Sequence, residues 1–168
     1  MRILNRNVYV GPSQYAKFPV IRLELDLGVL EQWPTAKLGG GFVDALVAAL
    51  PGLAEHGCSY REPGGFIRRM REGEGTWLGH VAEHVALQLQ QEAGHDQRRG
   101  KTRMVKIRPG VYNSIYAYTN EEVGLAAGRL AVALVNDLVE AQEDFDFATE
   151  LERFLTRAER TAFGPSTG

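Results

Sequence analysis

Residues 76–91, TWLGHVAEHVALQLQQ, are the part of the chain that most constrains its fold. Apolar residues recur there at helical spacing, so a single stripe of an α-helix collects Leu78, Val81, Ala82, Val85 and Leu89. Thr76 is the predicted N-cap of this helix, and Gly94 is the predicted C-terminal stop. The segment therefore predicts an amphipathic helix that packs one face into a core.

The opposite side of this helix carries His80, Glu83 and His84 in the order H-x-x-E-H, the inverted form of the zincin motif. Two neutral imidazoles one helical turn apart can bind one Zn²⁺, while the glutamate between them remains free to take a proton from water. The spacing therefore predicts a zinc site with His80 and His84 as ligands and Glu83 as the general base. The competing interpretation is a solvated helix face that happens to carry two histidines.

A catalytic zinc ion usually takes three protein ligands, so the two histidines leave one ligand to be found. A helix predicted at residues 121–140, capped by Asn120, begins with Glu121 and Glu122. We prefer Glu121 as the third ligand, although acids in a first helical turn are also expected simply because they complement the helix dipole. For stabilising an oxyanion, the nearest candidates are Tyr116, Tyr118 and Arg103.

The charge of the chain is unevenly distributed. A net charge of −2 excludes a strongly basic nucleic-acid binder. Nevertheless, six cations and no acid lie between residues 97 and 108: Arg98, Arg99, Lys101, Arg103, Lys106 and Arg108. This run is either an ordinary solvated surface or an anion-binding rim near the predicted zinc site.

The hydrophobic pattern predicts one α+β domain, because 168 residues with 44% hydrophobic content can form a single core. Strand-like segments are expected at residues 2–4, 7–10, 20–27 and 110–118, and further helices at residues 41–50, 65–71 and 147–162. The alternation in residues 20–27 favours a half-buried antiparallel strand. We therefore expect a small, largely antiparallel sheet covered by helices.

The chain has one cysteine, Cys58, which excludes an intrachain disulfide and favours a reducing compartment. We interpret Cys58 as a small packed hydrophobe. The sequence shows neither a signal peptide nor an apolar run of ~18 residues, so we expect a cytoplasmic protein without a membrane span.

Five sequence motifs together resemble the N-terminal domain of cyanophycin synthetase. They are GGFIRRMREG at residues 64–73, GTWLGHVAEHVALQLQ at 75–90, GKTR at 100–103, PGVYN at 109–113 and EEVGLAAG at 121–128. The resemblance covers essentially the whole chain. It implies a domain at residues 1–162 and a linker at 163–168 leading to an ATP-grasp module, with a Mur-ligase-like module beyond.

The resembled family makes multi-L-arginyl-poly-L-aspartate from aspartate, arginine and ATP. The resemblance implies that this domain binds the polymer and, in some members, cuts it by metal-dependent hydrolysis into primers for elongation. His80, His84 and Glu121 would then bind the metal and Glu83 would be the base. The cations expected to hold the polymer's carboxylates are Arg68, Arg69, Arg71, Arg98, Arg99, Lys101 and Arg103.

Two alternatives remain open at this point. The domain could be a non-catalytic tether that holds the polymer near active sites elsewhere in the synthetase. A purely structural zinc site is less favoured, because such sites usually use four ligands, often thiolates, and the chain has a single cysteine.

Overall fold

A computed structural model describes residues 1–57 and 63–163 of the chain. Its four strands are β1 (Arg2–Tyr9), β2 (Val20–Asp26), β3 (Gly100–Met104) and β4 (Val111–Ala117). They form one open sheet in the order β1-β2-β4-β3, and every neighbouring pair is antiparallel. The predicted α+β class with an antiparallel sheet is confirmed.

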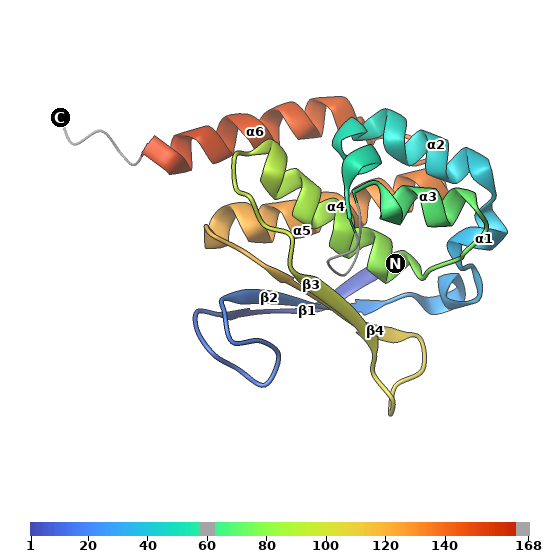
Figure 1. The fold of residues 1–168 in the computed structure, drawn as a ribbon, viewed down its shortest axis with the longest axis horizontal. Coiled ribbons are helices and arrows are strands. Elements are labelled where there is room, and N and C mark those ends of the chain that lie inside the picture. The colour runs from blue at the N-terminus through green and yellow to red at the C-terminus, as the bar shows by residue number, and fades with distance from the viewer. Residues whose placement is uncertain (58–62, 164–168) are drawn as a thin grey trace.

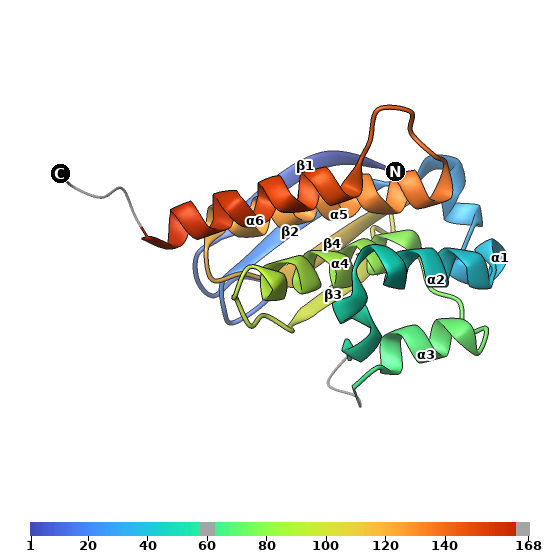
Figure 2. The ribbon, with the colours of Figure 1, turned by 90° about the horizontal axis from the view of Figure 1, so that it is seen from above.

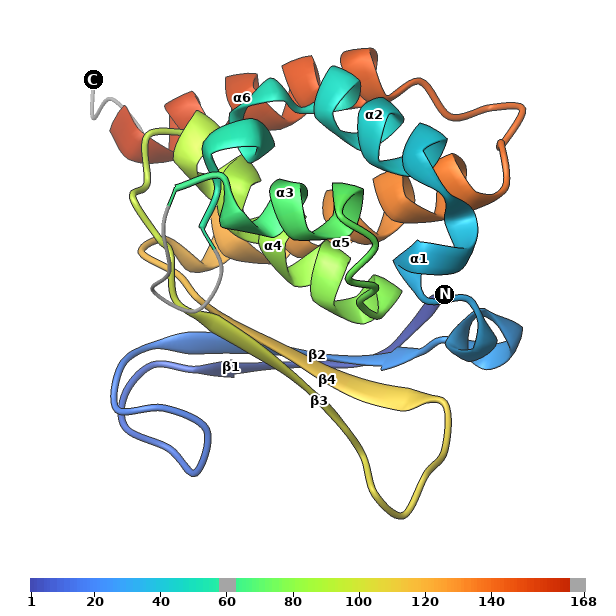
Figure 3. The same cartoon turned by 45° about the vertical axis from the view of Figure 1, so that its right-hand side comes forward.

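The helices lie together on one face of this sheet (Figure 1). They are η1 (Gly28–Gln32), α1 (Thr35–Leu38), α2 (Gly40–Ala49), η2 (Pro51–Glu55), α3 (Gly65–Arg71), α4 (Leu78–Glu92), α5 (Glu121–Val139) and α6 (Phe147–Phe163). Helix α4 packs over β3 and β4, and α5 lies beside α4 over β1 and β2. The other helices form an outer layer, with α6 along α5 and α2 and α3 on the opposite side of α4 (Figures 2 and 3).

The core lies between the sheet and the inner helices. Apolar and polar residues alternate along β2 as predicted, so the apolar ones face this core. Ile21, Leu23 and Leu25 are buried on the helix side of the sheet. Two glycines of α5 allow that helix to approach the sheet closely. A side-chain carbon at Gly124 would lie 2.6 Å from Ile21 Cδ1, and one at Gly128 would overlap the hydroxyl of Tyr116. Both positions therefore require glycine for this close approach.

Helix α4 differs from the prediction at its start and in its burial. It begins at Leu78, and its N-cap is Trp77, without a side-chain cap. Thr76 is not the N-cap, because its hydroxyl contacts the side chain of His80, at 2.7 Å from Nδ1, instead of capping a backbone N–H group of the first turn. Gly94 adopts a φ of 83° just beyond the helix, so the predicted stop is confirmed. From Leu78 to Gln90 the helix is almost entirely buried, so it is not a helix with one solvated face.

Two strands also differ from the sequence prediction. Residues 2–4 and 7–10 belong largely to the single strand β1, which has an irregularity between Ile3 and Asn5. Strand β3 lies within the basic run and was not predicted, because its residues do not alternate between apolar and polar. Cys58 and residues 164–168 of the expected linker lie outside the described residues. None of the helices that the structure describes is long and apolar enough to cross a membrane.

Candidate metal centre

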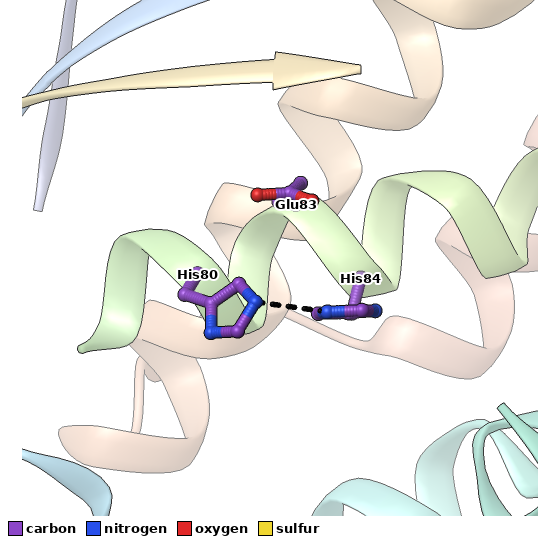
Figure 4. A group of neighbouring side chains, drawn as sticks. All are labelled: His80, Glu83 and His84. Atoms are coloured by element: carbon purple, nitrogen blue, oxygen red, sulfur yellow. Dashed lines mark hydrogen bonds between the residues drawn. The ribbon is translucent and has the colours of Figure 1, made fainter. Parts of the chain in front are cut away.

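His80 and His84 point their Nε2 atoms at each other on one side of α4, with Glu83 on the neighbouring side of the helix (Figure 4). The two Nε2 atoms are 2.9 Å apart, and the ring centroids are 4.6 Å apart. His80 Nδ1 lies 2.7 Å from the hydroxyl of Thr76, and the tautomer that donates a proton in this contact turns the lone pair of Nε2 toward His84. The contact with Thr76 fixes the orientation of the His80 ring, and in this tautomer Nε2 can bind a metal ion.

The His84 ring is enclosed by aromatic residues. Phe66 of α3 stacks on it with a centroid distance of 4.0 Å, and His56 packs edge-on at 4.9 Å. His56 is itself fixed by Gln88, whose Oε1 lies 3.1 Å from His56 Nδ1. Within the described residues, His84 Nδ1 is buried without a hydrogen-bond partner.

Burial keeps both histidines of the pair neutral at pH 7. It lowers the pKa of His80 to about 4. It also lowers the pKa of His84 well below its usual value, with smaller contributions from the neighbouring His80 and His56. Neutral imidazole is the form that coordinates metal ions.

Glu83 is buried against β3, with 2% of its surface exposed. The hydroxyl of Thr102 donates to Glu83 Oε2 at 2.6 Å. The carboxylate also lies so close to Gly100 that a side-chain carbon there would be 2.8 Å from Glu83 Cδ. Burial raises the pKa of Glu83 to about 8, although the hydrogen bond from Thr102 acts in the opposite direction. Without a nearby cation, the carboxyl group is therefore largely protonated at pH 7.

These three side chains fit a divalent cation. Their ligand atoms lie within 4.8 Å of one another. Two nitrogen ligands at ~2.0–2.1 Å from a tetrahedral zinc ion are roughly 3.3 Å apart, which is close to the separation of the two Nε2 atoms. Zn²⁺ accepts imidazole nitrogens as ligands, and a carboxylate beside them can serve as the base that takes a proton from water.

The structure does not bring Glu121 to this group. Glu121 is exposed at the start of α5, and Glu122 forms an ion pair with Arg157. A side chain at Gly124, one turn into α5, would contact Gln90 at 3.5 Å. Because Gln90 lies six residues beyond His84, it is roughly 9 Å further along α4. The N-terminus of α5 thus lies beside the C-terminal end of α4, so the structure places the predicted third ligand, Glu121, away from the two histidines.

A cleft of about 480 Å³ opens onto the metal-binding group. Its lining residues come from α4, its N-terminal flank, β3 and β4: Thr76, Trp77, His80, Glu83, His84, Arg98, Arg99, Gly100, Lys101, Thr102, Met104 and Tyr112. Three of the predicted polymer-binding cations, Arg98, Arg99 and Lys101, thus lie beside the histidines. The β1–β2 loop holds two of them, because Arg99 stacks on Phe18 at 5.0 Å and Lys101 donates to the carbonyl of Tyr15.

The other predicted cations lie elsewhere. On α3, Arg68, Arg69 and Arg71 are not among the residues lining the cleft, and they form ion pairs with Glu72, Glu74 and Asp44. The exposed Arg103 does not line the cleft either.

The candidates for stabilising an oxyanion also change. Tyr116 is fully buried and donates to the carbonyl of Gly124, and Tyr118 is absent from the residues lining the cleft. Tyr112 lines the cleft instead.

Sequence reasoning missed Thr102 and Gly100 as neighbours of Glu83, and Trp77 and Tyr112 as cleft residues. A signal for Thr102 and Gly100 was present, since both belong to the GKTR motif that carries the family resemblance.

Comparison with known proteins gives one consistent result. A sequence model described as the cyanophycin synthase-like N-terminal domain matches residues 21–140. Similar proteins are the cyanophycin synthetases of Synechocystis sp., 40% identical over 99% of this chain, and of Geminocystis herdmanii, 38% identical over 99% of it. That of Trichormus variabilis is 42% identical over 83% of the chain. The chain spans 19% of the length of the first two relatives and 15% of the third.

Proposed function

Because this chain belongs to the family of cyanophycin synthase-like N-terminal domains, we propose that it binds cyanophycin and cuts the aspartate backbone of that polymer by zinc-dependent hydrolysis. The cut pieces would serve as primers for polymerisation. The observation that carries the proposal is the pair of Nε2 atoms 2.9 Å apart beside the buried Glu83, all three residues lining one cleft.

His80 and His84 would hold the ion through Nε2. Zn²⁺, when bound, supplies the Lewis acidity that activates water and polarises a carbonyl group. Glu83 must be ionised to act as a base, and a cation held by the adjacent histidines favours its ionised form. The carboxylate then takes a proton from the attacking water, while Thr102 fixes Oε2 and Gly100 leaves room for the group.

The basic wall of the cleft would select the polymer. Each arginyl unit of cyanophycin carries a free α-carboxylate, and Arg98, Arg99 and Lys101 can form charge-assisted hydrogen bonds with such groups. The relatives are about five times longer than this chain, which supports the further proposal that it works beside ATP-grasp and Mur-ligase-like modules of a synthetase.

The deciding experiment combines metal analysis with polymer cleavage. Glu83→Gln keeps the shape of the side chain but cannot accept a proton, so we expect it to retain zinc and polymer binding and to lose ~10²–10⁴-fold in cleavage rate. His80→Ala and His84→Ala should lose stoichiometric zinc. Glu121→Gln is the matched control, and it should keep both zinc and cleavage.

Each other outcome has a definite meaning. Zinc loss in Glu83→Gln would make Glu83 a ligand instead of the base. Cleavage at the wild-type rate in Glu83→Gln would refute the hydrolytic mechanism. Polymer binding without any cleavage by the wild-type protein would support the tethering alternative.

A further inference from the structure

The cleft has two chemically different ends, because α4 and β3 run antiparallel along it. Gly79, near the start of α4, packs against Thr102 and Tyr112, and Glu83, one turn later, packs against Gly100. Beyond them, Gln91 donates to the carbonyl of Gln97. Met104 therefore lies at the N-terminal end of α4, and Arg98 and Arg99 lie toward its C-terminal end. The five residues from Gly100 to Met104 alone span ~13 Å of strand.

Large apolar side chains are exposed at the N-terminal end of the cleft. Trp77 is 40% exposed and Met104 is 51% exposed. The indole of Trp77 rests against the ring of Tyr112, with a centroid distance of 6.0 Å. Both residues line the cleft together with His80. A partly exposed indole held in place by a buried ring offers a flat face to a ligand in the cleft.

A carboxylate, that of Glu31, reaches the hydroxyl of Tyr112 from outside the set of residues that line the cleft. The hydroxyl of Tyr112 is 3.5 Å from Glu31 Oε1. In the part of the chain that the structure describes, no Lys or Arg forms an ion pair with Glu31. An exposed indole with an unpaired carboxylate nearby is an arrangement that binds organic cations. The start of α4 carries a partial positive charge that opposes a cation, so the negative charge of Glu31 is needed there.

We propose that Trp77, packed against Tyr112 and with the Glu31 carboxylate at the Tyr112 hydroxyl, forms a subsite for a guanidinium group at the N-terminal end of the cleft. A planar guanidinium can stack on the indole, which a compact ammonium group cannot do. The inference rests on the proposed function, since the ligand is then an arginyl unit of the polymer. It adds an orientation of the polymer in the cleft: an arginyl guanidinium of the polymer lies at Trp77, and carboxylates of the polymer lie at Arg98 and Arg99.

The test compares two small ligands by calorimetric titration into the full chain. One is the dipeptide in which arginine is joined to the side-chain carboxyl of aspartate. The other is the same dipeptide with citrulline, whose neutral urea group keeps nearly the same shape as the guanidinium. Wild-type protein should bind the arginine dipeptide about two- to fivefold more tightly, as expected for a cation on an exposed aromatic face.

Three substitutions locate the preference. Trp77→Leu and Glu31→Gln should both remove the preference for arginine, and Trp77→Phe should keep part of it, because a smaller aromatic face remains. Glu31→Gln should lower the affinity for the arginine dipeptide more than the affinity for the citrulline dipeptide, because a charged donor loses more than a neutral one. The ratio of the two affinities is the readout, because a general loss of structure would lower both affinities together.

The outcomes separate this subsite from the proposed hydrolysis. Equal binding of both dipeptides by the wild type, or a preference that survives in Trp77→Leu, would refute the subsite. Failure of both dipeptides to bind while the polymer is still cut would also refute it and leave the hydrolysis standing. A preference that depends on Trp77 in a protein that cuts no polymer would support the subsite and refute the hydrolysis.

Discussion

Glu83 and His84 are buried and His80 is half-buried, and all three are mainly uncharged in the metal-free protein, although at pH 7 each group would be at least partly charged in water. Burial lowers the pKa of His80 to about 4 and raises the pKa of Glu83 to about 8. Without an ion, the site therefore disfavours charge of either sign. A divalent cation reverses this preference for Glu83, so binding of the ion should be coupled to release of a proton.

This coupling predicts a pH-dependent stability for the metal-free protein. The pKa of Glu83 is higher in the folded state than its ordinary value of 4.5, so the folded state binds the proton more tightly. The stability that this group contributes is fully present below pH 4.5 and is lost as pH rises toward about 8. His80 acts in the opposite direction, since its contribution is lost as pH falls from 6.5 toward about 4.

Urea unfolding of chelator-treated protein measures the effect. Between pH 6.5 and pH 8.5 we expect the free energy of unfolding to fall by on the order of 2 kcal/mol, since each pH unit over which one proton is released corresponds to ~1.4 kcal/mol. Glu83→Gln does not titrate and should remove most of this fall. An equally steep fall in Glu83→Gln would assign the pH dependence to another group.

At the scale of elements, the close contact between α4 and β3 creates the site. Gly100 of β3 faces the carboxylate of Glu83, and a side-chain carbon there would lie 2.8 Å from Glu83 Cδ. Thr102, two residues on, donates the hydrogen bond that fixes the same group. One short edge strand thus determines both the space and the orientation available to the proposed base.

Gly100→Ala should therefore displace Glu83 without touching the histidines. We expect polymer cleavage to fall at least tenfold with zinc content unchanged, and the free energy of unfolding to fall by about 1–3 kcal/mol because of overpacking. Gly41→Ala in α2 is the control, since a side-chain carbon there meets nothing within 4 Å. Normal cleavage by Gly100→Ala would show that the position of Glu83 does not limit the reaction.

At the scale of the whole molecule, six of the seven cations predicted to bind the polymer lie in two separate places, and Arg103 lies in neither. Arg98, Arg99 and Lys101 line the cleft, whereas the arginines of α3 form ion pairs with nearby acids. Arg98 also contacts Asp96, but both side chains are largely exposed, so that ion pair contributes little. The net charge of −2 therefore coexists with a local basic wall.

Polymer binding should depend on the cleft cations and on salt. Arg98→Glu combined with Arg99→Glu should weaken binding roughly tenfold, because charge-assisted hydrogen bonds are lost, with zinc content intact. Arg68→Glu combined with Arg71→Glu is the matched charge reversal on α3 and should have a smaller effect. Polymer co-sedimentation from 0.1 to 1 M salt measures both, since the Debye length falls from ~10 to ~3 Å over this range. Equal, salt-independent binding by all three proteins would refute electrostatic capture.

Local patterns in the sequence were sufficient to predict most elements. The H-x-x-E-H spacing places two histidines one turn apart on any α-helix, so the meeting of their Nε2 atoms could be foreseen. Alternation in β2 and the Asn120 cap of α5 were likewise predicted correctly, because each depends on residues close together in the chain. The basic strand β3 was missed because it lacks alternation and is specified by its pairing with β4.

Only the tertiary structure decided what surrounds the motif. The sequence indicated which residues share a face of α4, but not that Phe66 and Thr102 would cover that face and make Glu83 and His84 buried. It could not exclude Glu121 as a ligand either, because the distance between two helices depends on how both pack on the sheet. Helical periodicity fixes directions around one axis, whereas burial, pKa and the choice of neighbours depend on contacts between segments far apart in the chain.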